Sequence, residues 1–266
     1  MISFSFSISH TPWRRERVDA LKSMLNGLET HKYSFPLFIN DVDLRGKHWQ
    51  DEGKVELALR QWEWHTKQDV EWHVLATDDL ELAPKFVRCL GALLSVVPFE
   101  CPVGFLSNHP RGPSLAAEGF HWYATNSWLV GPMYALHRTV LPKFLAWYKA
   151  LPDGPALQHK SRAWYNDDSA LNEFVTHVGG GRSVHPLPTI IEHRADLEST
   201  VGHGDRYSRE RFSWRVERRV RQVGDTLEWT EIPYTRVGGI EPLTAQMTWL
   251  ARGGPQGAPM LAVGGE

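Results

Sequence analysis

The first hundred residues alternate between short segments of period-two hydrophobicity and longer segments whose apolar residues recur every three or four positions. Residues 2–8 alternate between polar and apolar side chains, which is typical of a β-strand. A regular succession of strands and helices favours a parallel sheet that is covered by helices. The predicted strands are 2–8, 33–41 and 72–77, and the predicted helices are 14–28, 55–67 and 84–97.

Two of these helices have a one-sided apolar stripe, as a helix that packs on a sheet requires. The stripe predicts which side chains of each helix are buried. The expected buried side chains are Val18, Leu21, Leu25 and Leu28 in the first helix, and Phe86, Leu90, Leu93 and Leu94 in the third.

Beyond residue 100 the predicted elements follow one another less regularly. They are a strand at 103–106, a polar loop at 107–119, strands within 122–134, helices at 140–151 and 167–178, and an extended segment at 186–193. The last sixteen residues are rich in glycine, and we expect them to have no stable structure. The expected parts of the chain are a domain over 1–204, an Arg- and aromatic-rich extension over 205–250, and this tail over 251–266.

Polar residues follow each of the first three predicted strands. Ser9 and His10 follow the first strand, residues 41–43 contain two aspartates after the second, and Asp78 and Asp79 follow the third. In open α/β sheets, ligands bind beyond the carboxyl ends of the strands. We therefore expect these side chains to lie along one rim of the sheet.

The pair Asp78-Asp79 is the strongest candidate for chemistry. Adjacent carboxylates repel each other unless they are solvated, paired or metal-bound. Mg²⁺ or Mn²⁺ would relieve that repulsion, held by one or two carboxylates together with phosphate oxygens. The alternative is that the pair caps the next helix, since Asp is a favoured N-cap. His193 and His203 are candidates for a further metal ligand, with an ordinary structural histidine as the alternative.

A second acidic group, Asp167-Asp168, opens the last predicted helix. One of these carboxylates is a candidate general base that takes the proton of an acceptor hydroxyl. The alternative is again helix capping, and the sequence does not decide between them. Elsewhere the chain has no phosphate-binding Gly-x-x-x-x-Gly-Lys, no Gly-x-Ser-x-Gly elbow and no His-Glu-x-x-His.

Residues 206–221 form a basic and aromatic stretch with seven arginines and two glutamates. Arginine side chains suit phosphates, and aromatic side chains suit stacked or flipped bases. The alternative is a solvated helix face. The candidates for nucleic-acid contact are Trp214, Arg215, Arg218 and Arg219.

Composition narrows the class of protein. A hydrophobic fraction of 42% and a formal charge of −2 are those of an ordinary globular protein. Two cysteines exclude a disulfide framework and a four-cysteine zinc site. The N-terminus has no continuous apolar run like that of a signal peptide, and no segment approaches the roughly 18 apolar residues of a membrane span. We therefore expect a cytoplasmic protein without a membrane span.

Taken together, these segments resemble GT-A-fold glycosyltransferases, particularly small phage and bacterial ones related to the lipopolysaccharide-modifying type. The resemblance covers residues 2–203 and lies in the order of short motifs, with Thr77-Asp-Asp79 in place of the usual Asp-x-Asp. The matching motifs are Arg14 and Arg17 in the first helix, Gly46 and Trp49 after an Asp-bearing second strand, Leu59-Arg-Gln-Trp62, Thr77-Asp-Asp79, Trp128-Leu-Val-Gly-Pro-Met-Tyr-Ala-Leu136, Asp167-Asp168, and Pro188-Thr-Ile-Ile-Glu-His193 with Ser199 and Gly202.

The resemblance implies a GT-A-like, Rossmann-type mixed sheet flanked by helices, with the Arg-rich segment as a C-terminal extension. It also implies transfer of a sugar from a nucleotide-sugar donor, a UDP-sugar, with Mn²⁺ or Mg²⁺ as cofactor. The implied roles are metal binding by Asp79 and His193, donor binding by His10, Arg14, Asp41, Gly46, Trp49 and Asp78, and acceptor activation by Asp168 or Asp167.

The acceptor hydroxyl has two interpretations. A phage-type enzyme with an Arg-rich segment suggests hydroxymethylated pyrimidines in double-stranded DNA, in the host cytoplasm, where the base must leave the stack to be reached. Glycan or lipopolysaccharide acceptors are the alternative. The competing class is a non-catalytic protein that binds nucleic acid or a sugar nucleotide.

Overall fold

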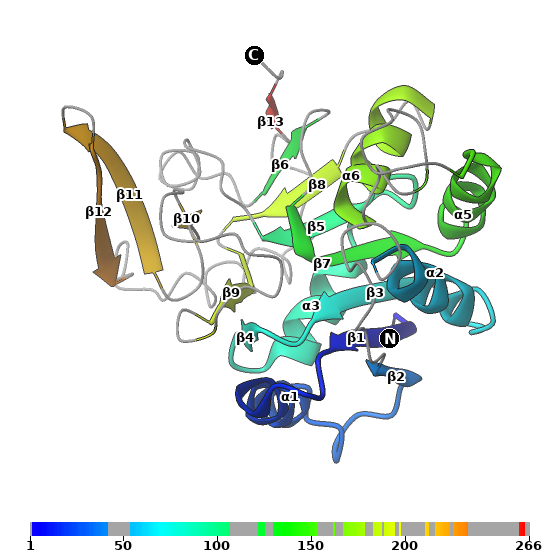
Figure 1. Cartoon of the computed structure of the whole chain (residues 1–266), viewed down its shortest axis with the longest axis horizontal. Helices are drawn as coiled ribbons and strands as arrows, with labels where there is room; N and C mark the ends of the chain where they lie inside the picture. The colour runs from blue at the N-terminus through cyan, green and yellow to red at the C-terminus, as the bar shows by residue number, and fades with distance from the viewer. Residues whose placement is uncertain are drawn as a thin grey trace.

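The computed structural model describes residues 2–41, 54–106, 122–125, 130–153, 162, 167–178, 183–187, 189–194, 197, 211–212, 216–223, 226–233 and 261–263. Its centre is an eight-stranded sheet in the order β13-β6-β8-β5-β7-β3-β1-β2 (Figure 1). Helices lie on both faces of this sheet, and its strands run in both directions. The expected class, a mixed α/β sheet flanked by helices, is confirmed.

The N-terminal strands form the parallel part of the sheet. β1 (Phe4–His10) lies between β2 (Leu37–Asp41) and β3 (Trp72–Thr77), and all three run in the same direction. The register pairs His10 with Asp41 and Ser9 with Thr77. The carboxyl ends of the three strands therefore reach the same edge, as the sequence predicts.

The other strands make the sheet mixed. β7 pairs antiparallel with both β3 and β5, β8 pairs parallel with β5, and β6 pairs antiparallel with β8. Their bounds are β5 (Val103–Leu106), β6 (Trp122–Thr125), β7 (Val130–His137) and β8 (Ser183–Pro186). A separate two-stranded ladder joins β4 (Leu80–Leu82) to β9 (Ile191–His193) in the antiparallel direction.

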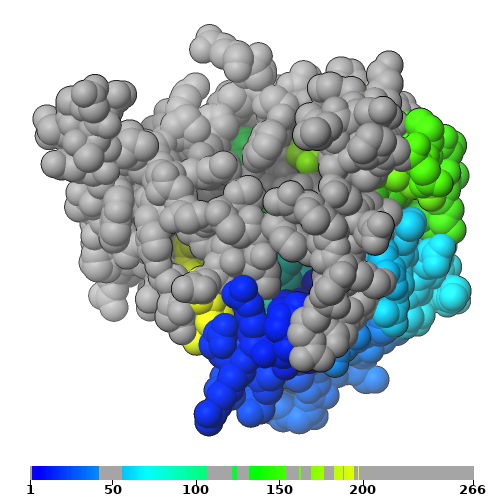
Figure 2. Space-filling view, in the orientation of Figure 1, coloured from blue at the N-terminus to red at the C-terminus, as the bar shows by residue number. Residues whose placement is uncertain are grey.

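Each face of the sheet is covered by its own helices and packs its own core. On one face, α1 (Arg15–Gly27) and α3 (Phe86–Leu94) share a cluster with the large apolar side chains of β1. On the other, α2 (Lys54–His65), α5 (Leu141–Ala150) and α6 (Asp167–Glu173) pack over β3 and β7, and α6 continues into a π-helical turn, Phe174–Val178. Figure 2 shows α5 in green and α2 in cyan next to each other at the surface, on the right of the view.

The predicted helix faces agree with the structure in α3 and differ in α1. All four predicted side chains of α3 are buried. In α1 the buried line runs through Arg17, Ala20 and Met24, while the predicted Leu21 and Leu25 pack at its margin. Leu28, just beyond the helix, is buried as predicted. The helix is rotated by about one position from the predicted face, and this rotation turns Arg17 inward.

The strand β1 is buried on both faces, although its sequence alternates like that of a half-exposed strand. Ser5 and Ser7 are fully buried beneath α2. They belong to a chain of hydrogen bonds that we call the polar seam, formed by Ser5, Ser7, Ser9, Gln61, His65 and His73.

The polar seam is fully hydrogen-bonded when each group donates in one direction. Ser9 donates to Gln61 Oε1 (3.0 Å), and Gln61 Nε2 donates to Ser7 Oγ (3.1 Å). Ser7 then donates to His65 Nε2 (2.8 Å), so that His65 Nδ1 carries the hydrogen donated to Ser5 Oγ (2.7 Å). Ser5 in turn donates to His73 Nδ1 (2.9 Å). This direction requires both imidazoles to be neutral.

Burial explains why both imidazoles are neutral. It lowers the pKa of His65 well below its ordinary value, with the nearby His73 as a second cause. Burial, followed by the charge of His137, lowers the pKa of His73 to about 4. The seam therefore consists of uncharged groups near neutral pH.

The charge pattern of the C-terminal extension allows a helix as one interpretation, but the structure has strands in this segment. Three strands, β10 (Arg211–Phe212), β11 (Val216–Val223) and β12 (Thr226–Pro233), form an antiparallel sheet. In the tail that we expected to have no stable structure, β13 (Leu261–Val263) pairs parallel with β6, so the expectation does not hold for these three residues.

No helix in the described part of the chain has the length and apolar character that crossing a membrane requires.

Candidate functional site

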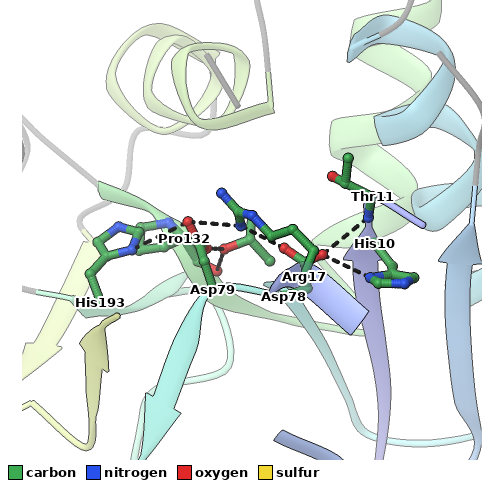
Figure 3. A network of polar contacts seen from close by, with 8 residues as sticks. His10, Thr11, Arg17, Asp78, Asp79, Pro132 and His193 are labelled. Carbon is green, nitrogen blue, oxygen red and sulfur yellow. Dashed lines mark hydrogen bonds and ion pairs between the residues drawn. The ribbon is translucent and has the colours of Figure 1, made fainter. Parts of the chain in front are cut away.

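The ends of β1 and β3 meet at the two adjacent aspartates (Figure 3). The backbone N–H of Asp78 donates to the carbonyl of Ser9 (3.1 Å), which joins the end of β3 to the end of β1. His10 is buried at this edge, and Asp41 is exposed at the end of β2. The aspartates do not cap the next helix, because β4 follows them and the N-cap of α3 is Lys85. The helix-cap interpretation is therefore wrong.

Asp78 holds the connection between β1 and α1. Its Oδ2 lies 2.8 Å from His10 Nδ1 and accepts a hydrogen bond from the Thr11 backbone N–H at 3.0 Å. Its Oδ1 accepts a hydrogen bond from Arg17 Nη1 at 2.7 Å. The residue is 2% exposed, so these contacts take the place of water around a buried carboxylate. Both carboxylate oxygens are thus engaged within the protein.

Asp79 presents one carboxylate oxygen to a set of cationic or metal-ligating side chains. Its Oδ1 accepts a hydrogen bond from the Thr77 hydroxyl at 2.6 Å, which orients the carboxylate. Its Oδ2 lies 3.1 Å from Arg17 Nη1 and 3.7 Å from His193 Nδ1. Arg17 and His193 approach this oxygen from α1 and β9, elements that are far apart in the sequence.

The ladder between β4 and β9 brings His193 to Asp79. The register pairs Leu80 with His193, and the backbone N–H of Arg194 donates to the carbonyl of Asp79 (2.9 Å). The imidazole is partly exposed, with 18% of its side-chain surface open. The structure therefore places together the two residues that the resemblance implies as metal ligands.

The geometry of Asp79 and His193 fits a divalent cation. Ligand atoms that lie about 2.1 Å from one ion are at most about 4.2 Å apart. The separation of 3.7 Å between Asp79 Oδ2 and His193 Nδ1 allows one ion to contact both. An imidazole ligand favours Mn²⁺ over Mg²⁺, because Mg²⁺ prefers oxygen ligands.

Two protein ligands leave most of the coordination sphere of such an ion to other groups. Within the described residues, no set of three or more His, Cys, Asp or Glu side chains is arranged to hold a metal ion. Mg²⁺-type ions commonly take their remaining ligands from water and substrate phosphates. Asp79 and His193 are therefore the two side chains that the described residues would supply to such an ion.

Arg17 brings a buried positive charge to this site. Burial by itself lowers the pKa of its guanidinium, but the charges and hydrogen bonds of Asp79 and Asp78 outweigh burial and raise that pKa above its ordinary value. The guanidinium is therefore fixed as a cation between two carboxylates. It offsets half of their negative charge.

The other predicted site residues are placed less completely. Arg14 lies just before α1 and its backbone carbonyl accepts the N–H of Arg17, whereas Gly46, Trp49 and His203 lie outside the described residues. Asp167 and Asp168 open α6, which packs against α2 and β7, but their side chains are outside the part that the structure describes. Their proposed roles stay predictions.

The candidates for nucleic-acid contact fall in or beside the antiparallel C-terminal sheet. Trp214 and Arg215 lie outside the described residues. Arg218 stands opposite Glu231 and Arg219 opposite Thr230 in the register of β11 and β12. Together these two strands contain three arginines and three glutamates, whereas the other four arginines of the stretch 206–221 lie outside them.

Sequence reasoning did not select three residues that shape this site. In the sequence, Arg17 and Thr77 stand only within the motifs of the resemblance, and Thr11 stands in none of them. A helical register drawn through Ala20 and Met24 instead of Leu21 and Leu25 would have placed Arg17 on the buried side of α1. No signal in the sequence indicates that the Thr11 N–H binds Asp78.

Comparison with known proteins gives a distant structural likeness and no sequence match. No protein-family model matches the chain, and no curated protein sequence matches it. Among solved structures, it is similar to a glycosyltransferase involved in the glycosylation of the major capsid of PBCV-1, with 10% sequence identity and a TM-score of 0.41. The match covers 74% of this chain and 94% of that chain. At this level the likeness supports no argument about activity.

Proposed function

We propose that this chain is a metal-dependent glycosyltransferase that takes its sugar from a nucleotide-sugar donor, a UDP-sugar. The observation that carries the proposal is the meeting of Asp79, His193 and Arg17 beyond the carboxyl end of β3. This is the edge of an α/β sheet where ligands bind. A carboxylate, an imidazole and a fixed guanidinium suit a diphosphate that is bound with a metal ion.

In this reaction the bond between the anomeric carbon and the diphosphate breaks, and the acceptor hydroxyl bonds to the same carbon. A divalent cation bound by Asp79 and His193 would supply electrostatic stabilisation for the charge that develops on the diphosphate. Thr77 fixes the orientation of the Asp79 carboxylate through its 2.6 Å hydrogen bond. Asp168, or alternatively Asp167, accepts the proton that the acceptor hydroxyl loses.

The proposed donor site also uses the ends of β1 and β2. His10, Arg14 and Asp41 lie at or beside these ends, and we assign them to contacts with the nucleoside and phosphates. Asp78 contributes indirectly to this proposed site, because its carboxylate fixes the positions of His10, the Thr11 N–H and Arg17. Gly46 and Trp49 belong to the segment proposed to cover the donor.

The test is a panel of UDP-sugars incubated with the protein and Mn²⁺, followed by release of UDP. We expect turnover with at least one donor, more with Mn²⁺ than with Mg²⁺, and loss of turnover in Asp79→Ala. The matched control is Asp69→Ala, since Asp69 is a fully exposed carboxylate before the amino end of β3, outside the proposed site. No donor hydrolysis or transfer, together with unchanged UDP affinity in Asp79→Ala, would leave a non-catalytic binding protein as the better interpretation.

For the acceptor, we propose glycan or lipopolysaccharide hydroxyls alongside hydroxymethylated pyrimidines in DNA. Within β11 and β12 arginines and glutamates are equal in number, so binding of DNA would depend on the four arginines of the stretch 206–221 that lie outside these strands. A gel-shift assay with hydroxymethylated duplex at moderate salt separates the two. A shift that is lost on neutralising Arg215, Arg218 and Arg219 would favour DNA instead.

A further inference from the structure

Arg17 occupies a position in which it competes with a metal ion for Asp79. It is 1% exposed and reaches from the first turn of α1 to both aspartates. Its Nη1 lies 2.7 Å from Asp78 Oδ1 and 3.1 Å from Asp79 Oδ2. The latter is the oxygen that lies 3.7 Å from His193 (Figure 3). The guanidinium therefore contacts the oxygen that faces the second proposed metal ligand.

The two cations would be close neighbours. An ion about 2.1 Å from Asp79 Oδ2 lies at most about 5.2 Å from Arg17 Nη1, given the 3.1 Å between that nitrogen and the oxygen. Like charges at this separation in a buried site repel each other strongly. Arginine does not relieve the repulsion by losing its proton, because its pKa is far above neutral. A free metal ion therefore meets an acidic pair that is already half neutralised.

We propose that Arg17 is a built-in counter-cation that keeps the affinity of Asp79 and His193 for a free divalent ion low, so that the ion binds firmly only together with a diphosphate. The diphosphate brings negative charge that offsets the repulsion between Arg17 and the ion. It also supplies ligands beyond the two that the described residues offer. This inference rests on the proposed function and assigns Arg17 a positioning and electrostatic role.

A purely structural role for Arg17 makes a different prediction. If the guanidinium only ties α1 to the end of β3, its charge has no bearing on metal affinity. Removing it would then lower the stability of the fold and leave the binding of Mn²⁺ unchanged. Metal affinity, measured apart from activity, distinguishes the two roles.

The experiment is a titration of the full chain with MnCl₂, in which electron paramagnetic resonance reports the free ion, without and with UDP. We expect weak Mn²⁺ binding by the wild-type protein and at least about tenfold tighter binding when UDP is present. Arg17→Gln should bind Mn²⁺ without UDP at least about tenfold more tightly than wild type. Arg17→Lys keeps the charge and should stay within about threefold of wild type.

A second pair of variants tests the same inference if Arg17→Gln does not fold. The double variant Arg17→Gln/Asp78→Asn removes the cation together with one anion, so the buried net charge is unchanged. It should still bind Mn²⁺ more tightly than wild type, because the cation that it removes lies 3.1 Å from Asp79 Oδ2, the proposed ligand oxygen. Asp78→Asn alone should bind Mn²⁺ more weakly, which would show that the gain in the double variant comes from Arg17.

Two results would overturn the inference, and they differ in what they say of the proposed function. Equal Mn²⁺ affinity in wild type and in the folded Arg17 variants, with UDP still enhancing binding, would refute the role of Arg17 and leave the glycosyltransferase proposal in place. Absence of Mn²⁺ binding by every protein, with or without UDP, would overturn this inference and the proposed metal dependence together.

Discussion

The polar seam predicts that the fold loses stability in mild acid. His73 is buried and neutral, its Nδ1 accepts a hydrogen bond from Ser5, and its pKa is lowered to about 4. An unfolded histidine binds a proton near pH 6.5. Between these two values the unfolded chain binds more protons than the folded one, so the free energy of unfolding falls as the pH falls. The contribution of neutral His73 to the free energy of unfolding is present in full above pH 6.5 and is lost progressively toward pH 4.

The magnitude follows from the separation of the two pKa values. Each pH unit within the window removes about 1.4 kcal/mol of stability for one such histidine. From pH 7.5 to pH 5, His73 therefore costs the fold about 2 kcal/mol. His65 adds to this loss in the same direction, because its pKa is also lowered.

The substitution His73→Asn isolates the contribution of His73 to the pH dependence of stability. The asparagine Oδ1 comes near the position of the imidazole Nδ1, so it still accepts the Ser5 hydrogen bond and does not titrate. The assay is urea denaturation of both proteins at several values between pH 5 and 7.5. We expect the variant to lose about 2 kcal/mol less than wild type across this range.

The control is His31→Asn, because His31 is exposed and keeps its contact with water on folding. This variant should show the same dependence on pH as wild type. Parallel stability profiles for wild type and His73→Asn would refute the reasoning, since they would mean that His73 titrates alike in the folded and unfolded chains.

Two further predictions concern the metal side of the site and the helix α3. Thr77→Val removes the hydrogen bond that orients Asp79 and should lower turnover about tenfold. Thr77→Ser retains the hydroxyl and should keep most of the activity. Equal activity of the two variants would contradict the proposed orientation of Asp79. Gly91→Ala should raise the free energy of unfolding in urea by about 0.5–1 kcal/mol, because a Cβ there meets nothing within 4 Å. Gly27→Ala is the matched comparison and should gain less, because its Cβ would come within 3.3 Å of Leu82; an equal gain at both positions would argue against the packing described here.

The strand and helix pattern was readable from the sequence because local periodicity reflects which side chains a regular element can bury. The third and fifth strands, Trp72–Thr77 and Val103–Leu106, have the predicted bounds. The shared rim followed from the same pattern, since parallel strands bring their carboxyl ends to one edge. The pattern of strand ends therefore points to Asp78 and Asp79.

The β1 sequence shows where this periodicity misleads. Alternating Phe and Ser predicts one solvated face, yet Ser5 and Ser7 are fully buried. They are stable inside because α2 supplies Gln61 and His65 as hydrogen-bond partners. A strand sequence contains no information about which helix will cover it.

The sequence by itself determined that this chain forms a helix-covered α/β sheet with acidic residues at the end of its third strand. Only the tertiary structure decided what those acids contact. His193 reaches Asp79 through the pairing of β4 with β9, which joins segments distant in the chain. Arg17 reaches both aspartates because α1 turns it inward, against the rule that charged residues lie outside. Both outcomes depend on long-range packing and on the pairing of buried charges, and local hydrophobic patterns contain neither.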